Sequence, residues 1–293
     1  MILVVGATGV LGGMITHRLL ENGKPVRILV REGSDFQSLV DAGAEPVMGD
    51  VKDPASLRRA CEGIETVITT ANSAARGGED NVETVEVEGN RNLIDAAKAA
   101  GVRHFLFTSA LGASLDSPVP FLRGKAMAEE HLKASGMTYT ILSPNLFMEV
   151  WIGMIVGMPL QMGQPVTLVG EGNRKHTFVS MDDVAAFAVA VVDNPAARNQ
   201  QIFIGGPEAV SWNDVVERTE RVLGRQIPVR HITPGEPLPG LPETVTHLAA
   251  AMDTYDSPIG MSETARTYGV QLTSVDTFLQ RMFRGAEDAA ASA

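Results

Sequence analysis

Short apolar runs alternate with helix-like segments through roughly the first two hundred residues, and this alternation limits the possible folds more than any other feature. The runs do not alternate apolar and polar residues, which is typical of strands that are buried on both faces. They are ILVV at 2–5, VRILV at 26–30, AEPVMGD at 44–50, TVIT at 66–69, HFLFT at 104–108 and YTIL at 139–142. Helical patterns lie between them at 10–22, 35–42, 54–62, 83–100 and 121–135. The alternation predicts an α/β fold with a doubly wound parallel sheet.

The pattern changes after residue 144. The segment 145–163 is rich in Met, Phe, Trp and Gly and has no strand–helix repeat, whereas 176–194 returns to a strand and a helix and 201–206 reads as a further strand. The chain therefore leaves the sheet and returns to it, which predicts one domain over 1–150 and 175–205. A smaller region is predicted over 151–174 and 206–285, and a disordered tail over 286–293.

Charge and composition narrow the class of protein. The formal net charge is −11 and the basic residues are scattered, which disfavours a nucleic-acid surface. No apolar run approaches the roughly 18 residues of a membrane span, and the apolar N-terminus lacks the basic flank of a signal peptide. The single cysteine, Cys61, fits a reducing compartment, and the histidines are too dispersed for a metal site. These features predict a cytoplasmic protein without a metal, present as a monomer or homodimer.

The segment GATGVLG at 6–12 directly follows the first predicted strand and opens a helix. In that context Gly6 permits the tight turn, Gly9 lets a phosphate approach the backbone, and Gly12 allows the helix to pack closely. A turn that simply needs small residues is the alternative. The strand before it and the helix after it favour a dinucleotide site, with Thr8, Val10 and Leu11 completing the contacting loop.

The end of the second predicted strand indicates which dinucleotide binds. An acid there would hold the ribose hydroxyls of NAD, but this chain has Arg31, with Ser34 nearby. A guanidinium suits a 2′-phosphate, so NADP is predicted in preference to NAD, the alternative being a solvated surface arginine. Ligands gather at the carboxyl ends of parallel strands. We therefore expect the adenine near Asp50 and Val51, and the ribose and pyrophosphate near Ala71 and Asn72.

Taken together, several segments resemble the NmrA-like group of atypical short-chain dehydrogenases/reductases. The similarity covers most of 1–205 and rests on GATGVLG, Arg31, GDVKDPASL at 49–57, the helix and strand at 87–110, GKAMAEEHLKASGMTYTILSPNLFME at 124–149 and FVSMDDVAAFA at 178–188. The resemblance implies that 1–150 and 175–205 form a Rossmann domain that binds NAD(P), here NADP, and that 151–174 and 206–285 form a small substrate-binding region. It also implies that Thr108, Pro144, Asn145 and Phe147 are among the cofactor contacts. The group includes relatives of isoflavone reductase and triphenylmethane reductase, and also cofactor-sensing regulators without turnover.

The wider superfamily uses a tyrosine followed four positions later by a lysine. Lys125 matches that lysine, which implies binding of the cofactor ribose, but the residue four positions earlier is Phe121. None of the three tyrosines has a lysine four positions further on. Ser109 lies near the superfamily's serine position, although Ala110 is an alternative match. The resemblance thus implies an incomplete catalytic set in which the phenol is absent.

Because the cofactor carries the hydride, hydride transfer does not itself require a side-chain acid. It requires that the protein position the substrate against the cofactor and exclude water. An acceptor whose charge is delocalised, such as a quinone, an enone or a dye-like cation, suits a site without tyrosine. His176 is the alternative proton donor, unless it is a surface or hydrogen-bonded histidine. The sequence thus predicts an NADPH-dependent reductase of an apolar conjugated small molecule, or alternatively a non-catalytic NADP(H) sensor or scaffold. The predicted pocket, which is equally compatible with plain core or a dimer face, comprises Phe121, Phe147, Met148, Trp151, Met154, Ile155 and His176.

Overall fold

A computed structural model describes residues 1–74 and 77–291. The chain divides into two compact units. Unit 1 comprises Met1–Pro144, Val184–Phe203 and Tyr268–Val270, and unit 2 comprises Asn145–Asp183, Ile204–Thr267 and Gln271–Ala293. The division falls after Pro144, earlier in the chain than the predicted domain boundary after residue 150. The roles assigned to the two predicted domains stay predictions.

Unit 1 is built on a seven-stranded sheet in the order β3-β2-β1-β4-β5-β6-β8. Neighbouring strands from β3 to β6 pair in parallel, for example Val4 with Ile28 on one side and Ile68 on the other. The predicted doubly wound parallel sheet is therefore confirmed. The strands are β1 (Ile2–Val5), β2 (Val26–Val30), β3 (Glu45–Met48), β4 (Thr66–Thr69), β5 (His104–Thr108), β6 (Thr138–Pro144) and β8 (Gln200–Ile204).

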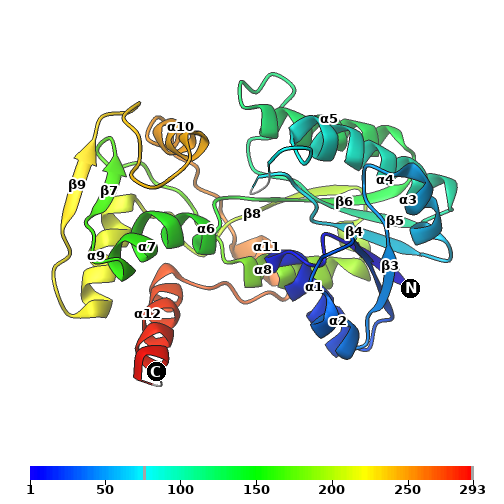
Figure 1. Ribbon diagram of the computed structural model, residues 1–293, viewed down its shortest axis with the longest axis horizontal. Helices are drawn as coiled ribbons and strands as arrows, with labels where there is room; N and C mark the ends of the chain where they lie inside the picture. The colour runs from blue at the N-terminus through cyan, green and yellow to red at the C-terminus, as the bar shows by residue number, and fades with distance from the viewer. Residues whose placement is uncertain (75–76, 292–293) are drawn as a thin grey trace. The chain divides into compact units, whose positions relative to one another are not determined.

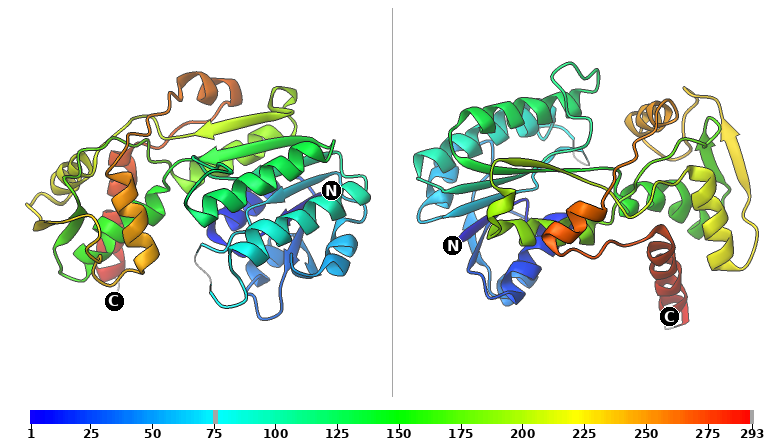
Figure 2. Two further views of the ribbon diagram at one scale, coloured as in Figure 1. Left: turned by 90° about the horizontal axis from the view of Figure 1, so that it is seen from above. Right: turned by 180° about the vertical axis from the view of Figure 1, so that it is seen from behind.

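Helices cover both faces of this sheet (Figures 1 and 2). One layer contains α3 (Pro54–Cys61), α4 (Glu88–Ala99) and α5 (Pro120–Ala134); the other contains α1 (Val10–Glu21), α2 (Gln37–Asp41) and α8 (Met181–Val192). The local sequence explains where they begin. At α3, for example, the Asp53 carboxylate accepts from the backbone N–H of Ala55, and Pro54 occupies the first helical position. The predicted helix 83–100 is divided into a π-helical segment, Val82–Val87, and α4.

Unit 2 has its own core around a two-stranded parallel sheet of β7 (Val166–Val169) and β9 (Val229–Ile232). Phe178 and Trp212 pack edge to face in this core, with ring centroids 5.1 Å apart. Its helical segments are α6 (Met148–Ile152), the π-helical η2 (Gly153–Gly157), α7 (Met158–Gln161), α9 (Trp212–Leu223), α10 (Glu243–Met252), most of α11 (Ser262–Tyr268) and α12 (Val275–Ala291). Because α12 includes 286–291 and the last two residues lie outside the described part, the disorder predicted for 286–293 stays a prediction.

The strand predicted from residue 176 onward is wrong. His176 forms isolated bridges with Val210 and Ser257, and Val179 forms another with Phe147. His176 and Thr177 hydrogen-bond with the segments at Val210 and Ser257, whereas Val179 hydrogen-bonds with the segment at 146–148, so these bridges do not join into a strand. A run of apolar and β-branched residues cannot reveal that its partners change from one residue to the next. Within the described residues, none of the helices combines the length and the hydrophobicity that a bilayer crossing requires.

The buried His104 at the start of β5 predicts a loss of stability in acid. Its side chain is 1% exposed, and burial lowers its pKa from 6.5 to about 4. Between pH 6.5 and about 4, His104 is therefore protonated in the unfolded chain but neutral in the folded chain. As the pH is lowered through this range, the free energy of unfolding decreases. Between pH 7.5 and 5.0 the loss from this group should be about 2 kcal/mol.

Urea unfolding of the wild type and of His104→Asn at both pH values tests this expectation. The variant lacks the titrating group, so its stability should depend on pH less steeply by that amount. Equal pH dependence in the two proteins would contradict it.

Candidate cofactor-binding and active site

The glycine loop forms a tight turn between β1 and α1. Gly6 has a φ of 86°, which strongly favours glycine, and the N–H of Gly9 donates to the Gly6 carbonyl at 3.0 Å. Gly9 is the N-cap of α1, and no side chain caps the helix there. Thr8, Gly9 and Val10 are exposed whereas Leu11 and Gly12 are buried. The loop therefore presents backbone and helix amides at the sheet edge.

This loop meets the segment that follows β4, at the point where the strand order reverses. The hydroxyl of Thr70 donates to the carbonyls of Val5 and Gly6, at 3.4 and 3.3 Å. A Cβ added at Gly12 would lie 2.1 Å from the Gly6 carbonyl oxygen and 2.9 Å from Thr70 Oγ1. A side chain at position 12 would therefore clash with the turn, and the close approach leaves a cradle of backbone atoms beside the uncapped start of α1, which suits an anionic ligand.

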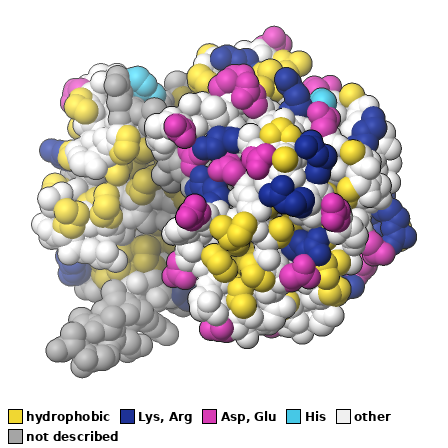
Figure 3. Space-filling model, turned by 45° about the vertical axis from the view of Figure 1, so that its right-hand side comes forward, with side chains coloured by type: hydrophobic (Ala, Val, Ile, Leu, Met, Phe, Trp, Pro, Cys, Tyr) yellow, Lys and Arg dark blue, Asp and Glu magenta, His cyan; other side chains and the backbone are white. Residues whose placement is uncertain are grey.

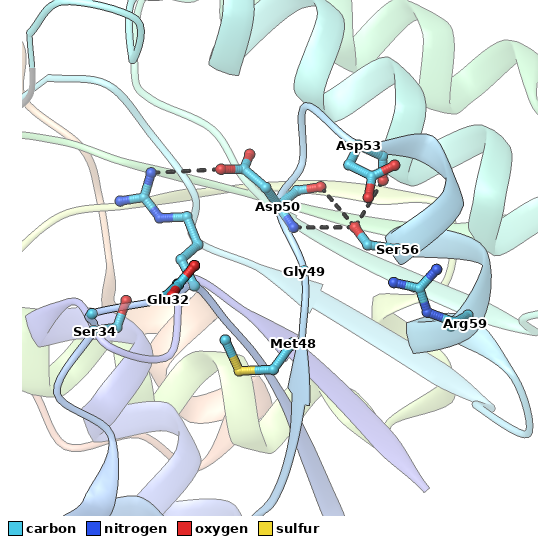
Figure 4. A pocket seen from close by; sticks show the side chains of 10 residues that line it. Glu32, Ser34, Met48, Gly49, Asp50, Asp53, Ser56 and Arg59 are labelled. Atoms are coloured by element: carbon cyan, nitrogen blue, oxygen red, sulfur yellow. Dashed lines mark hydrogen bonds and ion pairs between the residues drawn. The ribbon is translucent and has the colours of Figure 1, made fainter.

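A hollow of about 710 Å³ lies beyond the ends of β2 and β3. In Figure 4, Ser34 comes from the loop after β2 and Arg59 from α3, on opposite sides of the end of β3. Asp50 is held there by its backbone N–H, which donates to Ser56 Oγ at 3.1 Å. The hollow is lined by Arg31, Glu32, Gly33, Ser34, Met48, Gly49, Asp50, Asp53, Ser56 and Arg59.

Arg31 is only partly solvated. Its Nη1 lies 2.6 Å from a carboxylate oxygen of Asp80 and 3.7 Å from one of Asp50. The side chain is 36% exposed. Its two ion pairs both use Nη1; within the described part of the chain, no partner lies within hydrogen-bonding distance of Nε or Nη2. Of the other residues predicted for this end, Val51 and Ala71 are buried or half-buried and Asn72 is exposed.

Lys125 is the central side chain of the site. It is 2% exposed, and its Nζ donates to the carbonyls of Ala71, at 3.4 Å, and Thr108, at 3.3 Å. Those carbonyls follow β4 and end β5, so Lys125 is held at the carboxyl edge of the sheet. Nζ also lies 5.1 Å from the ring centre of Phe107 and 5.4 Å from that of Phe121. Burial lowers the pKa of Lys125 to about 8, against the opposing effect of two carboxylates, Glu86 and Glu129.

Two residues at the end of β5 differ in how their hydroxyls are used. Ser109 donates its proton to Glu129, whose carboxylate also accepts from Gln201 Nε2 at 3.2 Å. In contrast, Thr108 Oγ1 is buried and has no hydrogen-bond partner among the described residues. Because buried hydroxyls are almost always paired, this oxygen marks a place for a polar ligand atom. The catalytic role predicted for Ser109 stays untested, but its proton is engaged by Glu129.

Sequence reasoning missed the two buried carboxylates beside Lys125. Glu129 lies one helical turn from Lys125 on α5, and this i,i+4 spacing was the available signal. Glu86 accepts from the N–H and the hydroxyl of Ser73, at 2.7 and 2.6 Å. It comes from a separate segment, so no spacing along the sequence indicated it.

The remaining predicted residues lie in or next to unit 2. Pro144, which ends unit 1, accepts from the N–H of Leu111 at 2.9 Å, while the Asn145 amide donates to Thr177 and Ser257 inside unit 2. Met148 and Ile155 are buried in the unit 2 core. Their place in this core is enough to explain why these two residues are apolar, without the predicted role in a substrate pocket. Phe147, Trp151 and Met154 are half-buried.

The geometry argues against His176 as a proton donor. Its ring is fully buried, with Nε2 3.1 Å from the Met252 carbonyl and Nδ1 2.7 Å from Ser257 Oγ. The carbonyl can only accept, so Nε2 carries the proton and Nδ1 accepts from the serine. Burial lowers the pKa of His176, which keeps the ring neutral. The hydrogen-bonded alternative for this histidine matches the structure.

These residues fit a nicotinamide dinucleotide. The backbone cradle at Gly6 and Gly12, the uncovered amides of α1 and the unpaired Thr108 hydroxyl provide complementary groups along one sheet edge. Arg31 lines the hollow beyond β2 and β3, and Lys125 lies beside the end of β5. Among the residues that the structure describes, no group of three or more His, Cys, Asp or Glu side chains could hold a metal ion.

Comparisons with known proteins agree with this geometry. An NAD(P)H azoreductase from Xenophilus azovorans is 32% identical over 232 residues, which cover 79% of this chain and 76% of that protein. The photosystem II assembly factor Ycf39 of Cyanophora paradoxa is 34% identical over 233 residues, 79% of this chain and 71% of that protein.

Among solved structures, an NADPH-dependent quinone oxidoreductase from Escherichia coli in complex with NADPH has a TM-score of 0.82 at 24% identity, covering 97% of this chain and 100% of that one. At this level of identity the likeness shows the fold alone. The NmrA-like family model matches residues 1–279, almost the whole length of the chain. The protein therefore belongs to the NmrA-like family.

Proposed function

We propose that this protein is an NADPH-dependent oxidoreductase that reduces a flat, apolar, conjugated small molecule without a catalytic tyrosine. The observation that carries the proposal is the buried Lys125 ammonium at the sheet edge where the glycine loop and the unpaired Thr108 hydroxyl also lie. A desolvated charge held by two long hydrogen bonds is costly unless a ligand completes its coordination. A ribose hydroxyl is such a ligand.

Each part of unit 1 has a binding role in this proposal. The amides of Gly9 and the first turn of α1 hold the pyrophosphate, and Arg31 with Ser34 holds the 2′-phosphate, so NADPH is preferred over NADH. Lys125 holds the ribose, and Thr108 donates to the ligand beside it. The nicotinamide of the bound cofactor supplies the hydride.

The proposed acceptors follow from what stands beside Lys125. Phe121 has no exchangeable proton, and the Ser109 proton is bonded to Glu129. A conjugated acceptor spreads the added charge and needs only a weak acid. The Lys125 ammonium, with a pKa of about 8, can provide one near neutral pH. The relative named as an azoreductase, 32% identical to this chain, supports an acceptor of this kind.

The acceptor's apolar contacts are proposed to come from unit 2. Phe147, Trp151 and Met154 are the half-buried members of the predicted pocket. Trp151 also packs against the core of unit 2, and the remaining exposed parts of these side chains are proposed to contact a flat molecule. We retain unit 1 as the proposed cofactor-binding part and unit 2 as the proposed substrate-binding part.

Two measurements test the proposed function. Calorimetry with NADPH and NADH should show tighter binding of NADPH. NADPH oxidation, followed at 340 nm with a panel of quinones, enones, azo dyes and triarylmethane dyes, should show turnover with at least one class. Binding of NADPH without turnover across the panel would contradict the enzymatic proposal.

A second candidate is a non-catalytic NADP(H)-binding sensor or scaffold. One observation favours it: a relative that is 34% identical to this chain is named as an assembly factor, not as an enzyme. This candidate predicts that NADP⁺ and NADPH bind with different affinities and that a partner protein binds one of the two complexes preferentially. Equal affinities for the two nucleotides would contradict it.

A further inference from the structure

Four charged side chains form a compact network at the adenosine end of unit 1. Asp80 contacts both cations closely, with one carboxylate oxygen 2.6 Å from Arg31 Nη1 and the other 2.7 Å from Lys52 Nζ. Asp50 lies further from the same two cations, at 3.7 and 3.9 Å. Figure 3 shows how closely acidic and basic side chains are mixed on the face that it presents. Arg31 belongs to the lining of the hollow beyond β2 and β3, so the network borders that hollow.

The two carboxylates of the network, Asp50 and Asp80, differ in the groups that they contact. Asp50 accepts from the N–H of Lys52 at 2.9 Å, so it shapes the turn after β3 as well as contributing charge. Asp80 contacts both cations of the network, and its side chain is the least exposed of the four, at 15%. Hydrogen bonds from Lys52 and Arg31 lower the pKa of Asp80, so it stays ionised at neutral pH.

The charge balance of the network bears on any phosphate that approaches Arg31. Among the described residues, Asp80 and Asp50 both lie against Arg31 and Lys52, so part of the positive charge of these two cations is offset before a ligand arrives. A 2′-phosphate carries close to two negative charges and must compete with Asp80 for the same donors. A ribose without that phosphate meets no such competition.

We propose that Asp80 sets how strongly the site prefers NADP over NAD, by competing with the 2′-phosphate for Arg31 and for Lys52, which acts as a second phosphate-binding cation. This inference rests on the proposed binding of a nicotinamide dinucleotide. It adds two residues, Asp80 and Lys52, to the Arg31 and Ser34 that sequence reasoning assigns to that end.

Calorimetric titration of the full-length protein with NADP⁺, NAD⁺, 2′-AMP and 5′-AMP tests the proposal. In Asp80→Asn the amide keeps the shape of the side chain and removes its charge. Affinity for NADP⁺ and 2′-AMP should rise about tenfold relative to NAD⁺ and 5′-AMP. Lys52→Gln should shift the same ratio about fivefold the other way. Both shifts should shrink as salt rises from about 20 mM to about 500 mM, because the interactions are partly exposed.

Glu83→Gln is the matched control, because it removes one exposed carboxylate close by in the sequence, outside the network. It should leave the ratio within about twofold of the wild type.

An unchanged ratio in Asp80→Asn would overturn the proposal. So would a loss of NADP⁺ affinity, which would mean that Asp80 serves to orient Arg31. If the wild type binds neither NADP⁺ nor NAD⁺, the proposed function fails as well. If it binds and prefers NADP⁺ but the variants do not shift the ratio, only this inference fails.

Discussion

Replacing Lys125 with methionine is expected to lower kcat/KM for NADPH-dependent reduction by about 100-fold or more, equivalent to about 2.7 kcal/mol of transition-state stabilisation. Methionine fills a similar volume but cannot donate to a ribose hydroxyl or to a reduced acceptor. The protein should remain folded, because the ammonium is desolvated and makes only long hydrogen bonds to two carbonyls, at 3.3 and 3.4 Å. Steady-state kinetics, NADPH titration and thermal unfolding together measure these effects.

Arg123→Met is the matched control on the same helix. Arg123 is exposed and its guanidinium donates to the Ser117 carbonyl at 3.0 Å, so its loss should change kcat/KM by less than about threefold. The pH profile gives a second check. Because burial lowers the pKa of Lys125 to about 8, kcat/KM should decline as the pH rises above that value and the ammonium deprotonates. If Lys125→Met retains wild-type turnover, Lys125 has no part in the chemistry.

Gly12→Ala is expected to abolish measurable NADPH binding, with Kd rising more than about 100-fold. The added methyl carbon would lie 2.1 Å from the Gly6 carbonyl oxygen and 2.7 Å from its carbon, far inside van der Waals contact. The turn and the start of α1 would have to separate, which removes the cradle. Overpacking against backbone should also cost about 3 kcal/mol of stability. NADPH calorimetry and urea unfolding measure the two effects.

Gly13→Ala offers a control in the adjacent position. A Cβ there would be 3.4 Å from the Ala7 carbonyl oxygen, an ordinary contact, and alanine is the better helix former by up to about 1 kcal/mol. This variant should bind NADPH normally and unfold at the same or a higher urea concentration. If Gly12→Ala behaves like Gly13→Ala, the close approach of α1 to the turn does not determine binding.

The glycine turn between β1 and α1 could be predicted from the sequence because its determinants are local. A glycine loop between a strand and a helix specifies a backbone conformation within a few residues, and the positive φ of Gly6 agrees with it. Lys125 could be located by its spacing and by family resemblance. That Lys125 is almost fully buried and contacts Phe107 could not be foreseen, because burial depends on the packing of α5 against the sheet.

Unit 2 could be predicted much less well. The pair β7 and β9 joins residues more than sixty positions apart, and neither strand is long enough to give a periodic signal. Met148 and Ile155 occur in a segment whose apolar residues suit a core and a pocket equally, and they lie in the core. One carboxylate beside Arg31, Asp80, and one near Lys125, Glu86, could not be predicted for a similar reason. Asp80 and Glu86 come from segments remote in sequence, so only the tertiary structure brings them to the cations.

Lys125 donates to the main-chain carbonyls of Ala71 and Thr108, and the close approach of Gly12 to Gly6 is also a main-chain feature. Point mutations replace side chains and leave carbonyls in place. Under the proposed function, substitutions can therefore alter the half-buried aromatic and thioether groups of unit 2 one at a time, while the carbonyls that accept from Lys125 remain. A protein with this proposed function could then change its acceptor and still bind its reductant in the same way.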